Sequence, residues 1–248
     1  MYVTKKDVDD LIWDVLEKAR YIKPVGNNRT GYASWPQTVT HISAIVRAMH
    51  GVAKMPLGIK PNSWIEDTSC GLVIPCRNML LDPINKVTSD HTDKFFSLSC
   101  LPYNYDPDAQ CPLWAETVDE WVKGDNESVE LLQEWVGYLV SGRTDLHAML
   151  VCLGPKRAGK GTFVRIIMAV LGPTVVGSLK MSDLVGDRAR FSMSNNIDKS
   201  LIVFPDVRQI ESSEGKAFVQ FALNITGEDD IQVDIKNQTP WSGKVPAR

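Results

Sequence analysis

The sequence has no long hydrophobic run, no internal repeat and no tract of low complexity. Its longest apolar run, residues 148–153, is far shorter than the ~20 residues that a membrane-spanning helix needs. The first ten residues are charged and lack the apolar segment of a signal peptide. These absences predict a soluble protein that is not secreted and has no membrane partner.

The cysteines also lack the patterns that carry structural chemistry. There are five of them, an odd number, and no two form a C-x-x-C pair. This usage fits reduced thiols in a cytoplasm better than a disulfide framework, and the spacing of zinc ligands is missing. We therefore expect a cytoplasmic protein without disulfides or a zinc site.

The net charge of −3 at pH 7 gives no overall sign of nucleic-acid binding, but the charge is unevenly distributed. Residues 106–134 hold nine Asp and Glu against one Lys, whereas residues 154–190 hold seven Lys and Arg against two Asp. An acidic region followed by a basic one predicts a localised anion site in the second half of the chain.

The first 145 residues show the patterns of a mainly helical region. Between residues 64 and 105 the apolar runs are short and separated by Pro, Asp and Ser, which predicts short strands and loops. Pro24, Gly26 and Gly31 mark a loop. Apolar residues recur at helical spacing and predict helices over residues 5–21, 38–52, 111–121 and 129–142.

The remainder of the chain alternates differently. An apolar run at 148–153 predicts a strand, residues 161–171 a helix, and the run at 201–204 a second strand. Strand, loop, helix and strand in this order are typical of α/β domains. We therefore predict an α/β protein with a mainly helical N-terminal domain over residues 1–145 and a P-loop domain over residues 146–248.

A phosphate-binding motif stands between the first predicted strand and helix of this second region. Its sequence GPKRAGKGT matches G-x-x-x-x-G-K. Glycines let backbone N–H groups converge on phosphate oxygens, a helix N-terminus adds positive charge, and the lysine reaches the β- and γ-phosphates. The predicted nucleotide-binding residues are Gly154, Pro155, Lys156, Arg157, Ala158, Gly159, Lys160, Gly161 and Thr162.

The metal ligands are less regular. Gly161 stands where a Ser or Thr usually ligates Mg²⁺, which makes Thr162 the substitute. Asp206 follows the second apolar run and fits a carboxylate that orients the metal, although an ordinary acidic residue at a strand end is the alternative. We predict Lys160 and Asp206 as catalytic residues, Thr162 and Asp206 as metal ligands, and ATP with Mg²⁺ as cofactors.

Five ordered strings resemble the phage and plasmid primase-helicases, whose C-terminal motor is a superfamily 3 helicase of the AAA+ type. In that family the first two strings precede the motor, the next two are its Walker A and Walker B motifs, and the fifth is the B′ segment. The strings are LPYNYDPDAQCPLW (101–114), LQEWVGYL (132–139), GPKRAGKGT (154–162), FPDVR (204–208) and TGED (226–229), continuing to PWSG (240–243).

The resemblance implies an ATP-hydrolysing motor of a replication protein that unwinds or loads on DNA, in the cytoplasm of a cell hosting a phage, prophage or plasmid. It implies a DNA-contacting hairpin carrying Lys236, single-stranded or forked DNA as partner, and a hexameric ring in the full-length protein. Family members continue past the position of Arg248 into a sensor strand and an arginine finger. We therefore expect an incomplete AAA+ domain and an isolated chain with weak or no ATPase activity.

Two other functions stay open. Gly-Lys-Gly-Thr also closes the phosphate loop of adenylate kinases, although no Arg-rich lid follows it here. A non-catalytic adaptor with a vestigial nucleotide site is compatible with Gly161 and with the missing sensor strand. Among the remaining residues, Trp114 and Trp121 lie seven apart on one helical face, which favours core packing over base stacking.

Overall fold

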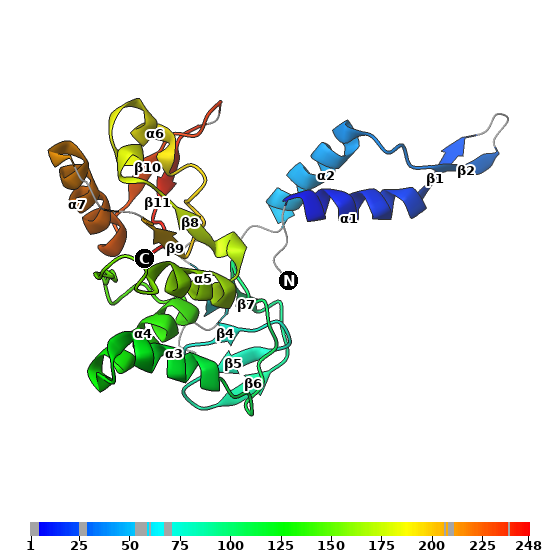
Figure 1. The fold of residues 1–248 in the computed structure, drawn as a ribbon. Helices are drawn as coiled ribbons and strands as arrows, with labels where there is room; N and C mark the ends of the chain where they lie inside the picture. The colour runs from blue at the N-terminus through cyan, green and yellow to red at the C-terminus, as the bar shows by residue number, and fades with distance from the viewer. Residues whose placement is uncertain are drawn as a thin grey trace. The chain divides into compact units, whose positions relative to one another are not determined.

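The computed structural model describes residues 5–24, 29–52, 59, 61–66, 71–205, 207, 211–237 and 239–248. Over these residues the protein is mixed α/β, with seven α-helices and sheets of two or three strands (Figure 1). The chain divides into two compact units, Met1–Ile59 and Lys60–Arg248. The α/β class predicted from the sequence is thereby confirmed.

The first unit packs two helices, both of them predicted, against each other. Helices α1 (Lys5–Lys18) and α2 (Val39–Val52) bury Ile12, Leu16 and Ile42 between them. Thr38 precedes α2 and caps its N-terminus. Its hydroxyl oxygen accepts a hydrogen bond from the His41 N–H at 3.3 Å, which satisfies a backbone group that the helix leaves unpaired.

An antiparallel hairpin joins these helices, where the sequence indicates only a loop. It pairs β1 (Arg20–Pro24) with β2 (Thr30–Ser34). The Trp35 N–H donates to the Ala19 carbonyl at 3.2 Å, which ties the base of the hairpin to the end of α1. Figure 1 shows the two strands extending beyond the helices of this unit.

The second unit opens with the short strands that its interrupted apolar runs predict. A three-stranded antiparallel sheet and a two-stranded pair share this region, and the core of the sheet contains Ile74, Cys76 and Leu101. The strands are β4 (Ile74–Pro75), β5 (Leu80–Asp82) and β6 (Val87–Ser89) in the sheet, and β3 (Ser63–Trp64) with β7 (Phe95–Phe96) in the pair.

Three further helices share one apolar core. They are α3 (Pro112–Val122), α4 (Asn126–Ser141) and α5 (Lys160–Leu171). Leu139 of α4 packs with Phe163 and Ile167 of α5, and these side chains are almost completely buried. Because α4 and α5 contribute to the same core, the predicted domain boundary at residue 145 lies within a compact unit.

The last part of the chain surrounds a two-stranded parallel sheet. Its core contains Met193, Ile202, Ile225 and Val233, from elements that follow α5 in the chain. These elements are β8 (Val176–Ser178), α6 (Ala189–Ser192), β9 (Leu201–Val203), α7 (Ser212–Thr226), β10 (Ile231–Val233) and β11 (Trp241–Gly243), with short 3₁₀ helices at Pro173–Val175, Met181–Leu184 and Gly186–Arg188.

The strand predicted at residues 148–153 is wrong. This segment carries no strand, and the side chains of Val151 and Leu153 are 61% and 90% exposed. A strand needs a partner for its N–H and C=O groups. In the structure β8 pairs with β9, and the other edge of β9 pairs with the chain end, since Ile202 N–H donates to the Arg248 carbonyl at 2.9 Å.

No helix among the described residues is long and apolar enough to span a membrane. The four cysteines within the described ranges, Cys76, Cys100, Cys111 and Cys152, are free thiols, as the sequence predicts.

Candidate phosphate-binding site

The predicted phosphate loop forms the entry to α5. Residues 154–158 are exposed, and the helix begins at Lys160, directly after Gly159. Gly159 has φ +80, a left-handed conformation that glycine adopts without steric cost. The Thr162 and Phe163 N–H groups donate to the Gly159 carbonyl at 2.8 and 2.9 Å, which closes the first turn. The structure therefore brings all nine predicted loop residues together at a helix N-terminus.

The side chain of Lys160 lies over this loop. Its Nζ donates to the Gly154 carbonyl at 2.8 Å and to the Pro155 carbonyl at 2.7 Å. An ammonium group that takes exposed backbone carbonyls as partners can exchange them for phosphate oxygens, which are stronger, charged acceptors. The lysine that the motif singles out is thus held at the N-terminal end of α5.

Three aromatic side chains form a floor beneath the loop. Trp114 and Trp121 of α3 pack on Phe163 of α5, with ring centroids 6.4 and 6.2 Å apart. A Cβ added at Gly159 would come within 2.7 Å of the Trp121 indole nitrogen. The prediction that both tryptophans belong to the core is confirmed, and Trp121 in addition fixes how closely the loop approaches α3.

Sequence reasoning missed this second role of Trp121. Its seven-residue spacing from Trp114 indicates a shared helical face but not the element that the face covers. A glycine of the motif and a buried tryptophan 38 positions earlier meet only through tertiary packing. No pattern within either segment identifies that contact.

The environment of the loop is positively charged. Lys156, Arg157 and Arg165 accompany Lys160, and Lys156, Arg157 and Lys160 lie within five positions of one another. Partial desolvation raises the pKa of the neighbouring Cys152 thiol, and the charge of Lys160 opposes this rise. The thiol therefore stays protonated at neutral pH, which makes it a poor nucleophile.

The two predicted metal ligands, Thr162 and Asp206, are less well supported than the phosphate loop. The Thr162 hydroxyl accepts a hydrogen bond from the Arg165 guanidinium at 2.9 Å, so a cation already occupies one side of the predicted ligand. β9 ends at Val203, before the predicted carboxylate, but Asp206 itself lies outside the described residues. No cluster of three His, Cys, Asp or Glu suited to a metal occurs in the part of the chain that the structure describes.

The structure contains an antiparallel hairpin at the position where the resemblance implies a DNA-contacting one. β10 and β11 pair antiparallel, and Lys236 lies exposed in the turn region between them. This hairpin packs through Val233 on the core of Met193 and Ile202, whereas the phosphate loop belongs to the core around α5. The two predicted sites are therefore built on different clusters of the second unit.

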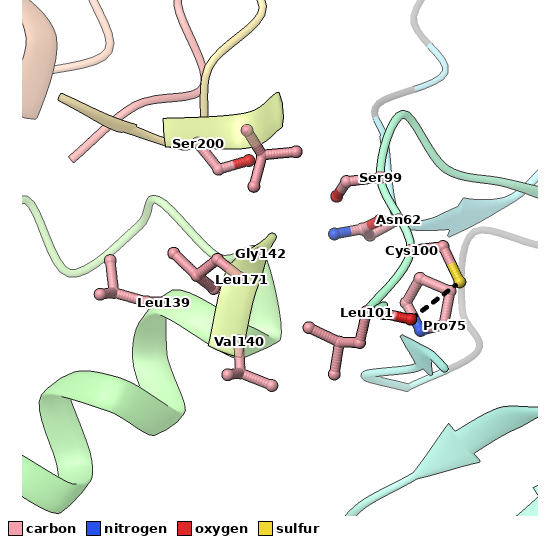
Figure 2. A pocket seen from close by; sticks show the side chains of 11 residues that line it. Asn62, Pro75, Ser99, Cys100, Leu101, Leu139, Val140, Gly142, Leu171 and Ser200 are labelled. Carbon is pink, nitrogen blue, oxygen red and sulfur yellow. Dashed lines mark hydrogen bonds between the residues drawn. The ribbon is translucent and has the colours of Figure 1, made fainter. Parts of the chain in front are cut away.

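Two hollows of the second unit lie away from the loop. Figure 2 shows the smaller one, where Leu139 and Leu171 face Pro75 and Leu101 across a cavity of about 20 Å³. That volume admits a single water molecule and no metabolite. The larger hollow, about 530 Å³, lies between β8 and α6 and is lined by Asp183, Arg188 and Phe191. Neither of them includes a residue of the phosphate loop.

Comparison with known proteins gives distant similarities. Residues 152–248 match the model of a family described as a family of unknown function (DUF5906). The A form apo structure of the NrS-1 C-terminal region is similar with a TM-score of 0.47 and 14% sequence identity. That similarity covers 97% of this chain and 54% of the other, so this chain spans about half the length of its structural neighbour. No curated protein matches the sequence.

Proposed function

We propose that residues 154–162 bind the triphosphate of ATP, and that the chain is the nucleotide-binding part of a DNA-replication motor of the primase-helicase type. The observation that carries this proposal is the placement of Lys160. It is the first residue of a twelve-residue helix, it follows a left-handed glycine, and its ammonium group lies on the carbonyls of the loop. The lysine and the helix after the loop agree with the phosphate-binding motif, whereas the strand that normally precedes such a loop is not formed at residues 148–153.

The backbone supplies the remaining attraction. The first N–H groups of a helix have no intrahelical acceptor, and at α5 they follow directly on an exposed loop. Together with the dipole of α5 and the charges of Lys156 and Arg157, they favour a polyanion at this point. The exposed loop leaves much of a bound nucleotide uncovered, which supports completion of the site by a neighbouring subunit of a ring.

Magnesium enters the proposal through Thr162 and Asp206. A bound Mg²⁺ supplies neutralisation of the charge that develops on the phosphates during hydrolysis. Thr162 has to release its hydrogen bond with Arg165 before its hydroxyl ligates a metal. The freed guanidinium then lies at the same turn of α5 and is available to the nucleotide.

Titration with a fluorescent ATP analogue, with and without Mg²⁺, tests the site. We expect Lys160→Ala to weaken binding about tenfold or more, because a charge-assisted contact to phosphate is lost. Lys216→Ala is the matched control, since it removes an equally charged, exposed lysine of α7 outside the loop; its effect should stay within about threefold. Equal affinities for wild type and Lys160→Ala would remove the site assignment.

ATP turnover with added single-stranded DNA tests the motor. We expect Lys160-dependent binding with slow hydrolysis in the isolated chain, and faster hydrolysis when the chain is part of a ring. The observation that favours a second function is the Thr162–Arg165 hydrogen bond, which weakens the metal site. A nucleotide-binding adaptor without turnover would bind the analogue equally well with and without Mg²⁺ and would show no stimulation by DNA.

A further inference from the structure

The charge of the first unit is separated along the chain. Between Glu17 and Glu66 the sequence contains seven Lys and Arg residues and no Asp or Glu, although the whole chain has a net charge of −3. All acidic residues of the unit lie in α1. The hairpin and α2 are therefore cationic without an acidic residue of their own to neutralise them. Six of the seven cations belong to the first unit, namely Lys18, Arg20, Lys23, Arg29, Arg47 and Lys54, and Lys60 begins the second.

The β1–β2 hairpin displays aromatic rings among these cations. Ile22 pairs with Tyr32 across the strands, so both side chains lie on one face, and they are 63% and 81% exposed. Arg20, two residues before Ile22, lies on the same face. All five residues of β1 are exposed, and the β2 residues on this face, Thr30, Tyr32 and Ser34, are exposed as well. An isolated two-stranded hairpin gains little stability from such surface, which leaves these side chains available to a partner.

The base of the hairpin is fixed, whereas its strands are free. The Trp35 ring packs edge-on against Tyr21 and His41, with centroids 5.6 and 6.5 Å away. Arg20 donates through Nη1 to the Glu17 and Ala19 carbonyls at 3.3 Å, which anchors the start of β1 to the end of α1. A rigid base positions the exposed Tyr32 and Lys23 at a defined distance from the helices.

We propose that this hairpin binds single-stranded nucleic acid. An unpaired base stacks on the Tyr32 ring beside Ile22. The adjoining phosphates pass over the edge of the two-stranded ribbon to Lys23, which alternates onto the opposite face, and to Arg29, directly before β2. Exposed rings interleaved with cations are the combination that binds single strands without sequence preference. The ring selects against duplex, because paired and stacked bases present no free face to it.

This surface and the phosphate loop belong to different compact units. The hairpin lies in the first compact unit, whereas Lys160 lies in the second, and neither the charges nor the rings of the hairpin depend on a bound nucleotide. Failure of one proposal therefore leaves the other intact. Lys160→Ala should lose the ATP analogue and keep the oligonucleotide, and the hairpin variants should do the opposite.

The test uses the full chain and a fluorescein-labelled dT₂₀, followed by anisotropy at several salt concentrations. We expect Tyr32→Ala to weaken binding about tenfold through lost stacking, and Tyr32→Trp to preserve it. Lys23→Gln/Arg29→Gln should reduce the slope of log K against log salt by about 1.4, the value for two contacts to single-strand phosphates. The matched control Lys86→Gln/Lys216→Gln removes two exposed cations elsewhere and should leave the slope unchanged.

Three results would overturn the proposal. The first is unchanged affinity in both Tyr32→Ala and Lys23→Gln/Arg29→Gln. The second is equally tight binding of a 20-base-pair duplex, lost in the same variants, which would indicate shape-independent attraction to phosphate. The third is binding of vesicles containing phosphatidylserine with no binding of dT₂₀, which would assign the hairpin to a lipid surface. Because Tyr32 is largely exposed, circular dichroism should show unchanged thermal unfolding in its variants. A parallel titration with rU₂₀ distinguishes DNA from RNA as the ligand.

Discussion

Two of the antiparallel hairpins, β1–β2 and β10–β11, share one kind of cross-strand pair in opposite environments. In each, a β-branched residue pairs with an aromatic one: Ile22 with Tyr32 in β1–β2, and Val233 with Trp241 in β10–β11. Ile22 is 63% exposed, whereas Val233 is 3% exposed and packs on Met193, Ile202 and Ile225. The same cross-strand pair thus serves a surface in one unit and a core in the other.

The difference shows that strand pairing alone does not decide what a hairpin does. A pair of strands buries apolar area only where another element covers one of its faces. β10–β11 has that cover and is anchored as part of the fold, so only its turn with Lys236 is free to act. In β1–β2 Trp35 packs on Tyr21, whereas Ile22 and Tyr32 on the other face are exposed, so that face is available for binding.

The largest expected effect is on the free energy of unfolding, when the β-branched residue of each cross-strand pair is replaced by alanine. Val233→Ala should lower the free energy of unfolding of the second unit by about 2 kcal/mol, because it opens a cavity in a packed core. Ile22→Ala should change stability by less than about 0.5 kcal/mol, because the side chain is already in water. Urea unfolding followed by tryptophan fluorescence measures both, and similar midpoints for the two variants would contradict the assignment of core and surface.

A smaller effect on stability is expected at the exposed ion pair next to the β10–β11 hairpin. The Arg190 guanidinium lies 3.0 Å from the Asp234 carboxylate, immediately after β10, and its side chain is 71% exposed. Arg190→Ala should cost about 0.5 kcal/mol at low salt and almost nothing at 1 M salt, as exposed ion pairs do. A loss that persists at high salt would mean that Arg190 acts through packing of its aliphatic stem instead.

The sequence predicts those parts of the fold that depend on local periodicity. Apolar residues at helical spacing identify α1 to α5, and the compact run 201–204 identifies β9. The β1–β2 hairpin escapes this reasoning, because β1 is exposed along its whole length and β2 alternates only between exposed and half-buried small or polar residues around Tyr32. The run at 148–153 gives the opposite error, because an apolar sequence predicts burial but cannot supply the neighbouring strand.

The candidate site likewise has one part that the sequence predicts and one part that it does not. The nine loop residues are contiguous, so the motif places them without knowledge of the tertiary structure. Trp121 contributes through a contact with Gly159 that joins two segments far apart in the chain. We expect Gly159→Ala to weaken analogue binding more than Gly154→Ala, because an alanine at φ +80 is strained and its Cβ meets the indole, whereas Gly154 has no positive φ. Equal effects in the titration described above would show that the aromatic floor does not position the loop.

The smallest expected effect compares the two hairpins as ligands of nucleic acid. Lys236 is a single exposed cation in the β10–β11 turn, so Lys236→Gln should reduce the salt slope of dT₂₀ binding by about 0.7, half the change expected for Lys23→Gln/Arg29→Gln. Lys244→Gln, an exposed lysine just past β11, is the control and should leave the slope unaltered. Two hairpins in separate units that contact different phosphates contribute independently, so the triple variant should lose the sum of the two slopes. An unchanged slope in Lys236→Gln alone would make the β1–β2 hairpin the nucleic-acid contact of this chain and Lys236 a solvated turn residue.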